Sequence, residues 1–355
     1  MKHAPYQLLL AWILAACGAN NPSHLAESTD RMPSIAAAPA QIAEADFENQ
    51  FDTYVLPLMA QGESAYFTGV GGKQIHFFRL EHPSARAGVV ISHGFGESIL
   101  KYRESIYNLY ALGYSVYIWE HRGHAHSDRL LADRYKTHVD DFDHYVDDMQ
   151  IFMNTRVPHD KPLFLFAHSM GGAIALAWLE RHPGVFQAAV MNAPLLELNT
   201  APYPGWIARG LAGLLDFAGR DEDYAPGQKT FTPEGWVFEK ASTSSRVRFE
   251  RNRTDNLAED LAMGGVTVKW LRETLKATRH LTKRNTIRQV TTPILMFQAG
   301  RDTFVKPEAH DRFCAQAADC TLIKVQEARH EIFNETDAIR LPFWDKAAQF
   351  YESHL

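Results

Sequence analysis

The stretch FLFAHSMGGAIALAWLERHPG, residues 164–184, joins two kinds of secondary structure at a serine. Residues 164–166 form a short apolar, aromatic run that is typical of a buried strand. Residues 173–179 are rich in Ala and Leu and end near a glycine, which is typical of an α-helix. Ser169 is therefore predicted at a sharp strand-to-helix turn, with its side chain exposed and the next N–H near a helix N-terminus. This position suits a nucleophile, provided that the chain also supplies a base, an acid and an oxyanion site.

Two polar residues later in the chain complete such a set. Asp302 directly follows an apolar run in MFQAGRDTFV, and His330 follows the last one in VQEARHEIFNE. His330 would remove the proton of Ser169 and later protonate the leaving group, while Asp302 would hold the imidazole in the required tautomer. Glu308 and Asp311 remain alternatives for the acid.

An oxyanion site is predicted beside an earlier strand. ISHGFGES, residues 91–98, places glycines at the end of an apolar run, where backbone N–H groups can point into a cleft. The N–H groups of Phe95 and Met170 are the predicted donors to the oxyanion. His168, next to the nucleophile, is expected to pack or hydrogen-bond, and His310 to be solvated. The acidic pairs at 140–141 and 147–148 are expected on a wet helix face.

Strands and helices alternate around these residues. The predicted strands are 87–92, 115–120, 163–167, 188–192, 293–298 and 321–325, and the helices are 102–112, 143–154, 170–181, 307–317 and 342–353. This alternation predicts an α/β fold with a mostly parallel sheet and helices on both faces. Between 193 and 288 it stops, which predicts an inserted, mainly helical cap over the edge of the sheet where ligands bind. The core would comprise 47–192 and 289–355.

The N-terminal residues resemble an export signal. An apolar run over 8–16 follows Lys2 and is too short to span a bilayer core of about 30 Å, which predicts a signal peptide at 1–16. LAAC, residues 14–17, resembles the bacterial lipobox, so Cys17 is predicted to be lipidated and to hold the protein on a membrane. Gly18 is similar to lipoproteins of the outer membrane, which implies the bacterial cell envelope, facing the periplasm. An ordinary signal peptide cleaved elsewhere is the alternative.

Residues 17–46 are rich in Ala, Pro, Ser and Asn and are predicted to be a flexible tether. A short helix over 49–56 is expected to stop before Pro57. Residues 64–69 and 73–80, joined through Gly71 and Gly72, are predicted to form a β-hairpin.

Composition limits the partners. The chain has 355 residues, a hydrophobic fraction of 46% and a net charge of −6, so it can bury a large core and gives no reason to expect nucleic acid. No His/Asp/Cys spacing resembles a ligand set, so no metal or other cofactor is expected. Cys314 and Cys320 are either a disulfide or two buried thiols, and their spacing does not decide between these.

Several motifs resemble one enzyme family. HGFGE (93–97), HRG (121–123) with Ser127, AHSMGG (167–172), GRD (300–302) and HE (330–331) are similar to α/β-hydrolases of the monoglyceride lipase and lysophospholipase group. HRGHAHSDRLLAD, HYVDDM, RHPGV and HDRFC resemble the proteobacterial lysophospholipase branch. Ala167 stands where the pattern has glycine, and its methyl group is small enough for the bend. Glu120 and Ala125 stand where relatives often carry aspartate and glycine.

The resemblance implies an α/β-hydrolase fold and hydrolysis of a lysophospholipid through an acyl-enzyme on Ser169. The alternatives are a monoacylglycerol lipase, a general carboxylesterase or thioesterase, and a non-catalytic lipid-binding lipoprotein, against which the set of Ser169, Asp302 and His330 speaks. An apolar stripe in the cap either lines an acyl-chain channel or packs the cap's own core; it comprises Trp206, Ile207, Leu211, Leu214 and Leu215. Four cap arginines either meet a phosphodiester or form a solvated face; they are Arg246, Arg248, Arg251 and Arg253.

Overall fold

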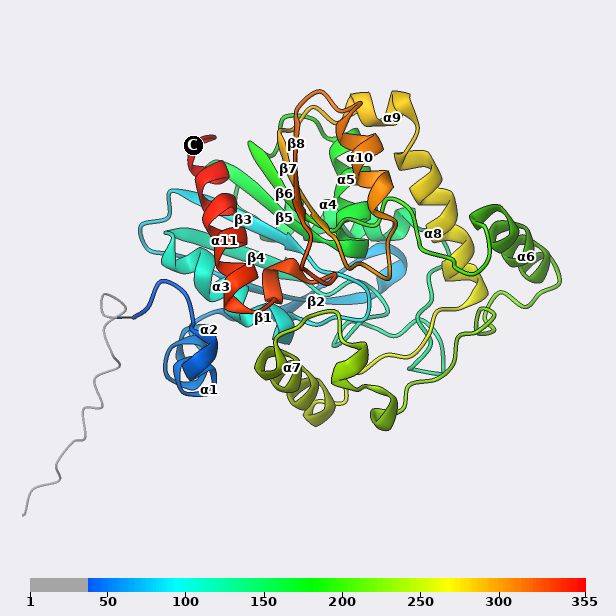
Figure 1. Ribbon diagram of the computed structural model, residues 1–355, viewed down its shortest axis with the longest axis horizontal. Coiled ribbons are helices and arrows are strands. Elements are labelled where there is room, and N and C mark those ends of the chain that lie inside the picture. Colours follow the sequence, from blue (N-terminus) through cyan, green and yellow to red (C-terminus); the bar gives the residue numbers. More distant parts are fainter. Residues whose placement is uncertain (1–37) are drawn as a thin grey trace, which may run out of the picture. The chain divides into compact units, whose positions relative to one another are not determined.

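A computed structural model describes residues 38–355. The predicted signal peptide, the predicted lipidation site at Cys17 and most of the predicted tether lie outside these residues. Within the described part, eight strands form one sheet in the order β1-β2-β4-β3-β5-β6-β7-β8 (Figure 1). The strands are β1 (Glu63–Thr68), β2 (Gln74–Leu80), β3 (Ala87–Ser92), β4 (Tyr114–Trp119), β5 (Leu163–His168), β6 (Ala188–Asn192), β7 (Ile294–Ala299) and β8 (Cys320–Val325).

The helices fall mainly between these strands. The longer ones are α3 (Ile99–Ala111), α4 (Asp143–Arg156), α5 (Ser169–Arg181), α6 (Gly205–Phe217), α7 (Arg246–Ala258), α8 (Val268–Leu281), α9 (Arg284–Gln289), α10 (Pro307–Cys314) and α11 (Asp337–Glu352). The N-terminal helical segment comprises η2 (Glu44–Asp46), α1 (Phe47–Gln50), η3 (Phe51–Val55) and α2 (Leu56–Met59). Short helical turns are η4 (Val70–Gly72), η5 (Pro233–Gly235), η6 (Phe238–Lys240) and η7 (Ile332–Asn334).

Strand pairing confirms the predicted mostly parallel sheet. β1 pairs with β2 and β2 with β4 in antiparallel fashion, and all other neighbours are parallel. The β1–β2 connection is the predicted hairpin, and its two glycines, Gly71 and Gly72, have φ angles of 66° and 77°. A side chain strongly disfavours this left-handed region, which is why the turn uses glycine.

Helices cover both faces of the sheet, as predicted. Every residue of β3, β4, β5, β6 and β7 is buried, which is expected of strands packed on both sides. Figure 1 shows α3 and α11 on one side of the sheet and α4, α5 and α10 on the other. On the first side, the ring of Phe166 in β5 lies 6.4 Å from Tyr102 and 6.0 Å from Phe343. On the second, Met149, Ile174 and Phe313 belong to one buried apolar cluster.

Two prolines lie inside helical segments where helix boundaries were predicted. The N-terminal segment continues through Pro57 to Met59 because Pro57 lies in the first turn of α2, where its missing N–H costs little. The last helix begins at Asp337, before Pro342. The buried Arg340 and Phe343 anchor that helix on either side of the proline, so tertiary contacts outweigh the local penalty of about 3 kcal/mol.

The folded part begins earlier than predicted. The tether was expected to reach residue 46, but Ile42 is fully buried. Its carbonyl accepts hydrogen bonds from Arg248 at 3.3 Å and Arg340 at 3.2 Å. The segment before α1 is therefore part of the core, because two buried guanidinium groups need its backbone oxygen.

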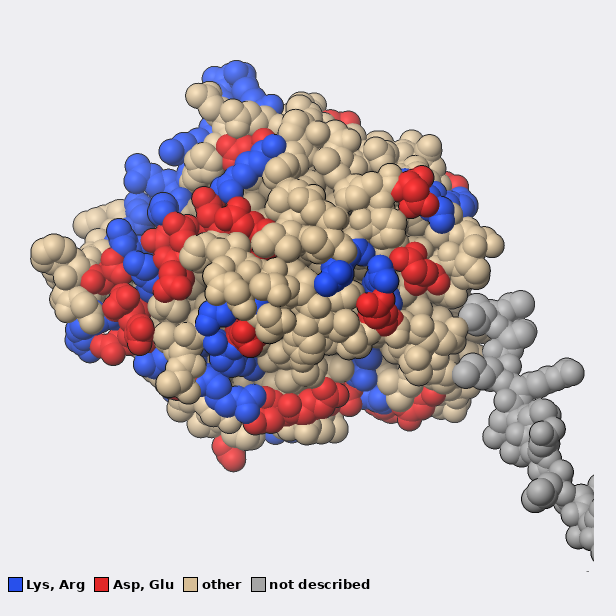
Figure 2. Space-filling model, turned by 180° about the vertical axis from the view of Figure 1, so that it is seen from behind, with Lys and Arg blue, Asp and Glu red and all other residues tan. Residues whose placement is uncertain are grey.

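The segment between β6 and β7 is mainly helical and contains α6, α7, α8 and α9, which Figure 1 shows in green to yellow. Figure 2 shows the opposite face of the molecule, where basic and acidic side chains are interspersed.

Candidate active site

Ser169 occupies a strained turn. β5 ends at His168 and α5 begins at Ser169, whose φ angle of 50° lies in the left-handed region. A non-glycine residue there costs on the order of 1–3 kcal/mol, and such strain is typical of a nucleophile turn. Gly171 makes the turn possible, since a Cβ atom at this position would lie 2.2 Å from Ser92 O and 2.3 Å from His93 O. The start of α5 therefore packs directly on the backbone at the end of β3.

Asp302 and His330 are in direct contact. His330 Nδ1 donates to Asp302 Oδ2 at 2.6 Å, and Asp302 Oδ1 accepts from the N–H groups of Phe304 at 2.8 Å and Val305 at 3.1 Å. Burial favours the neutral form of Asp302, but the bond from His330 and those from the backbone prevail and lower its pKa. An ionised Asp302 fixes the His330 proton on Nδ1, which leaves Nε2 as the lone-pair nitrogen.

The alternative acids lie elsewhere. Glu308 is exposed, and Asp311 pairs with Lys324 at 2.6 Å. His310, which was expected to be solvated, is buried and donates from Nε2 to the carbonyl oxygen of Pro194 at 2.7 Å. It faces inward because that side of α10 packs on the sheet.

His168 has the packing and hydrogen-bonding surroundings that were expected of it. Its ring centroid lies 4.7 Å from that of His330, and its Nδ1 lies 2.6 Å from Asn192 Nδ2. Burial lowers the pKa of His168 to about 4, so the ring is neutral at neutral pH. Asn192 also donates to the backbone oxygen of His330 at 3.0 Å, and it thereby fixes the loop that carries His330.

The two predicted oxyanion donors are available. Within residues 38–355, the N–H groups of Phe95 and Met170 have no hydrogen-bond partner on the chain. The preceding N–H, that of Gly94, donates to Glu97 Oε2 at 2.6 Å, which holds the loop in a tight bend. The Phe95 ring lies 5.2 Å from Trp270 of α8, so the cap contacts this loop directly.

A buried ion-pair network, which could not be predicted from the sequence, joins the loop that carries Phe95 to the loop that carries His330. Lys101 Nζ lies 2.8 Å from Glu97 Oε1 and 2.6 Å from Glu331 Oε1, and all three side chains are at most 10% exposed. Burial disfavours the charged lysine, but Glu331 and Glu97 together raise its pKa. Glu97 also accepts from Tyr102 at 2.6 Å. Glu97 and Glu331 belong to the motifs HGFGE and HE, which is the signal that could have identified them.

The four cap arginines do not form a headgroup site. Arg248 is buried and Arg251 is largely buried, and both pair with carboxylates of other segments. Of the four, only Arg246, whose side chain is 61% exposed, lies on a solvated face, which was one of the two predictions. Arg253 donates to the backbone of Trp236 at 2.9 Å. The pairs are Arg248 with Glu104 and Asp337, and Arg251 with Glu48, Asp52 and Asp255. These arginines therefore fasten α7 to α3, α11 and the N-terminal helices.

Asp148, expected on a wet helix face, is buried. Its two oxygens accept from Arg122 Nε at 2.6 Å and Nη2 at 2.7 Å, and one also accepts from the N–H of Val70 at 2.8 Å. The bidentate pair compensates for the loss of hydration, and it fixes the loop that carries the HRG motif.

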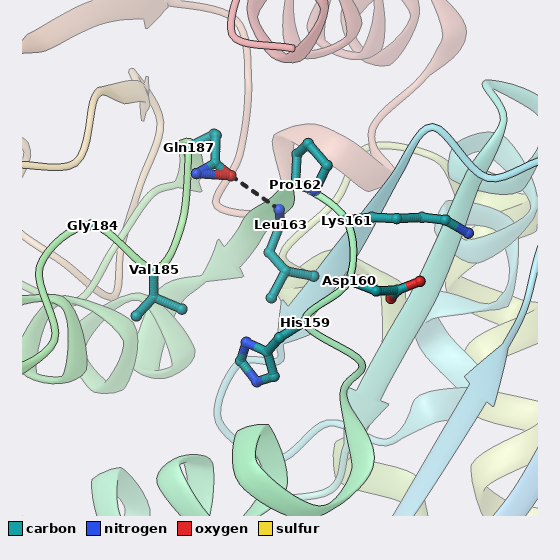
Figure 3. Close-up of a pocket in the computed structure, with 8 residues that line it drawn as sticks. All are labelled: His159, Asp160, Lys161, Pro162, Leu163, Gly184, Val185 and Gln187. Carbon is teal, nitrogen blue, oxygen red and sulfur yellow. Dashed lines mark hydrogen bonds between the residues drawn. The ribbon is translucent and has the colours of Figure 1, made fainter.

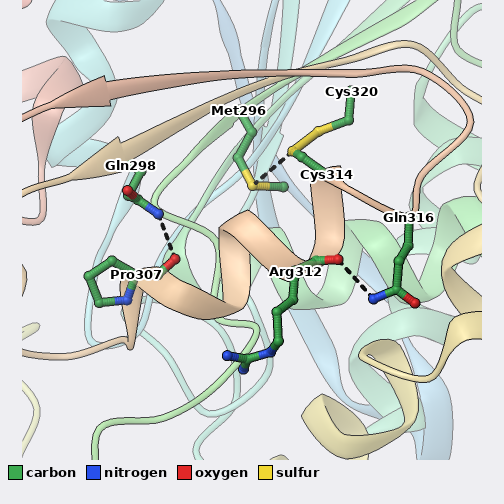
Figure 4. The surroundings of a disulfide bond; sticks show 7 residues. All are labelled: Met296, Gln298, Pro307, Arg312, Cys314, Gln316 and Cys320. Carbon is green, nitrogen blue, oxygen red and sulfur yellow. Dashed lines mark hydrogen bonds between the residues drawn. A yellow bond between two sulfur atoms is a disulfide. The ribbon is translucent and has the colours of Figure 1, made fainter.

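Cys314 and Cys320 form a disulfide in the structure (Figure 4). It joins the end of α10 to the first residue of β8, and Met296 Sδ lies 3.9 Å from Cys314 Sγ. His330 follows the other end of β8, so the disulfide lies at the end of the strands opposite to the loops that carry Asp302 and His330.

A surface pocket also lies at that far edge (Figure 3). It is formed around the starts of β5 and β6, where the N–H of Leu163 donates to Gln187 Oε1 at 3.2 Å. Ligands of parallel α/β sheets bind at the carboxyl ends of the strands, so this pocket is not the candidate active site.

The sheet topology and the serine at its strand-to-helix turn define an α/β-hydrolase. Residues 83–337 match the serine aminopeptidase S33 family of hydrolases, and the chain belongs to this family. It is 34% identical to lysophospholipase L2 of Escherichia coli K12, over 86% of this chain and 94% of that protein. It is 26% identical to the probable lysophospholipase L2 of Haemophilus influenzae, over 81% of this chain and 91% of that protein.

Solved structures have the same fold. A soluble variant of monoglyceride lipase from Saccharomyces cerevisiae aligns with a TM-score of 0.64 at 21% identity, over 83% of this chain and 97% of that one. The monoacylglycerol lipase of Paleococcus ferrophilus aligns with a TM-score of 0.62 at 20% identity, over 79% and 99%. These likenesses confirm the predicted α/β-hydrolase fold.

Proposed function

We propose that this hydrolase is a lysophospholipase, which cleaves the single carboxylic ester of a lysophospholipid through an acyl-enzyme on Ser169. One observation carries the substrate class: the chain spans 94% of the length of the Escherichia coli lysophospholipase L2 at 34% identity. The contact between His330 and Asp302 supports the reaction type. Monoacylglycerol hydrolysis is the alternative, supported by the weaker similarity to a monoglyceride lipase homolog of Monkeypox virus, 28% identical over 72% of this chain.

The residues supply each step of an acyl transfer. His330 Nε2 takes the proton of Ser169 as the hydroxyl oxygen attacks the ester carbonyl, and Phe95 and Met170 donate to the resulting oxyanion. The protonated His330, stabilised by Asp302, then protonates the departing glycerol oxygen, which leaves the acyl group on the serine. Water, activated by His330, releases the fatty acid and restores the hydroxyl. The balance is one ester and one water converted to one fatty acid and one alcohol.

The cap helix α6 supports an apolar substrate. Trp206, Leu214 and Phe217 lie along one side of α6 and are 68%, 64% and 90% exposed, while Ala212 alone among its residues is buried. Of the five residues of the apolar stripe, Trp206, Leu211 and Leu214 are exposed and do not form a core of the cap, whereas Ile207 and Leu215 are partly buried. Exposed apolar side chains next to a hydrolase core suit contact with acyl chains.

We also propose that the chain is a bacterial lipoprotein, acylated at Cys17 and held on the outer membrane. The lipobox-like LAAC supports this proposal. In residues 38–355, none of the helices has the length and hydropathy of a membrane-spanning segment. A lipid anchor would keep the enzyme at the surface where lysophospholipids occur.

An amide substrate is the second candidate, because the chain belongs to a family named after serine aminopeptidases. An aminopeptidase needs a carboxylate that binds the substrate's ammonium group. Glu97 and Glu331, the carboxylates in the two catalytic loops, both pair with Lys101 and are not free for this role.

A substrate panel tests the proposal. The purified enzyme is assayed with a lysophosphatidylcholine, a monoacylglycerol of the same acyl chain and an amino-acid p-nitroanilide, with Ser169→Ala as the control. We expect the highest kcat/KM for the lysophospholipid, no amide cleavage, and loss of all activity and of fluorophosphonate labelling in Ser169→Ala. A preference for the monoacylglycerol or the anilide would replace the substrate assignment, and an unlabelled wild-type protein would refute the enzyme mechanism.

A further inference from the structure

Three potential metal ligands that are distant in sequence converge beside the first strands of the sheet. His76 lies on β2, Glu120 directly follows β4, and His126 lies in the next loop. His76 Nδ1 and His126 Nδ1 each lie 3.0 Å from Glu120 Oε2, and the three ligand atoms lie within 4.8 Å of one another. We propose that these side chains bind a divalent transition metal ion, with Zn²⁺ as the best fit.

The surroundings of the two histidines match those of metal ligands. A metal-binding histidine typically directs its second ring nitrogen at an oxygen, which fixes the tautomer and orients the ligating nitrogen. His76 Nε2 lies 2.7 Å from Ser64 Oγ, and His126 Nε2 lies 3.0 Å from Glu259 Oε2. Both rings therefore have an outer partner that leaves Nδ1 for the ion.

The hydrogen-bonding capacity of His126 also calls for a cation. Its two nitrogens each face a carboxylate, Glu120 on one side and Glu259 on the other. Carboxylates only accept hydrogen bonds, and a neutral imidazole has one N–H, so it can satisfy one of them. Either a second proton on the ring or a metal ion between His126 Nδ1 and Glu120 resolves this conflict, and the metal ion leaves the single N–H to donate to Glu259.

Glu120 needs a positive charge nearby. Its side chain is fully buried, and in the part of the chain that the structure describes its only ion-pair partners are these two histidines. A buried carboxylate without a cation is costly. A divalent ion would supply the charge, and it can enter past His126, whose side chain is 29% exposed.

The ligand set indicates the class of metal. Two imidazole nitrogens and one carboxylate oxygen suit zinc and similar ions and leave a fourth position for water, whereas calcium and magnesium prefer all-oxygen sites. The earlier expectation of no metal rested on sequence spacing, and positions 76, 120 and 126 follow no known ligand spacing.

The position indicates a stabilising role. Glu120 Oε1 accepts from the N–H of Ile99, the first residue of α3, at 2.9 Å, and Glu259 follows α7 of the cap. The ion would thus fasten β2, the loop after β4, the start of α3 and the cap to one another. None of its ligands contacts Asp302 or His330, so zinc is expected to raise the melting temperature with little effect on kcat.

Zinc titration of the full chain tests the proposal. Chelator-treated protein is titrated with Zn²⁺ against a chromophoric chelator, and with Co²⁺ to record the absorption of a tetrahedral site. We expect one ion per chain and an affinity lower by about tenfold or more in His126→Ala. His280→Ala is the matched control, because His280 also pairs with a carboxylate, Glu180 at 2.9 Å, but no third potential ligand within residues 38–355 joins this pair. It should bind zinc like the wild type.

A second variant tests the site in case His126→Ala does not fold. Glu259→Gln changes a carboxylate that is 48% exposed and whose one ion-pair partner within residues 38–355 is the outer nitrogen of His126, so the variant should fold and still bind zinc more weakly. Substoichiometric binding by the wild type, or wild-type affinity in both His126→Ala and Glu259→Gln, would overturn the proposal. So would an imidazole NMR signal showing His126 doubly protonated in the presence of zinc.

Discussion

Replacing Asp302 by asparagine preserves the size of the side chain but changes which atoms donate. In the structure, Oδ1 accepts from the N–H groups of Phe304 and Val305, and Oδ2 accepts from His330. Only the oxygen of an amide can satisfy the two loop N–H groups, so its NH₂ must face His330 Nδ1. The imidazole would then carry its proton on Nε2, where it cannot take the proton of Ser169.

The expected loss in kcat is about 10³- to 10⁴-fold, which corresponds to about 4–5.5 kcal/mol in the activation barrier. KM should change little, because Asp302 contacts the base rather than the substrate. The fold should persist, since both loop hydrogen bonds are retained. The assay is steady-state hydrolysis of p-nitrophenyl butyrate at neutral pH, with a thermal melt of each protein.

Asp311→Asn is the matched control. It makes the same chemical change in a carboxylate on α10 that pairs with Lys324 on the surface, and its kcat should be close to the wild-type value. A loss of less than about tenfold in Asp302→Asn would contradict the assignment of the acid. A larger loss in Asp311→Asn than in Asp302→Asn would move the acid to α10.

Three further predictions concern stability, lipid contact and anchoring. Lys101→Met leaves two buried glutamates without their cation and should reduce the free energy of unfolding by about 3–5 kcal/mol at neutral pH, measured by urea denaturation. Lys101 lowers the pKa of Glu97, so the ion pair stabilises the fold above the pKa that a glutamate has in the unfolded chain, and this stabilisation is lost as the pH falls. If Lys101→Met lowered the free energy of unfolding equally at acidic and neutral pH, the network would be contradicted. Phe217→Ser should lower activity on micellar lysophospholipid while leaving p-nitrophenyl butyrate hydrolysis unchanged, and an equal effect on both would exclude a lipid-contacting role for α6. Cys17→Ser should move the protein from the membrane fraction to the soluble fraction, and an unchanged, detergent-requiring membrane pool would refute lipidation.

The order of strands and helices could be predicted because it depends on local patterns. The serine of AHSMGG lies between an apolar run and an Ala/Leu-rich run, and these two patterns indicate a strand and a helix without reference to the rest of the chain. The helix boundaries predicted at Pro57 and Pro342 were wrong because they rested on local patterns alone. Local proline penalties predict an end, whereas packing of the side chains around each proline maintains the helix.

Partners of charged side chains could not be predicted in the same way. The arginines of α7 look like a basic patch in the sequence, but Arg248 and Arg251 are paired with acids from α3, α11 and the N-terminal helices. Asp148 looks like half of a solvated acidic pair, yet it is buried against Arg122. Charge alone does not tell whether a residue faces water, because that depends on which segment packs over it.

The sequence by itself determined the alternating α/β architecture and the candidate residues Ser169, Asp302 and His330, since parallel strands bring their carboxyl ends to one edge and turn residues mark those ends. The tertiary structure alone decided which side chains meet across long separations. Lys101 and Glu331 are 230 residues apart and still share a buried ion pair, and His76 meets Glu120 across 44 residues. Such contacts depend on strand order and on the packing of loops, and no short-range sequence pattern predicts them. A polar side chain requires a specific partner only when the fold buries it away from water.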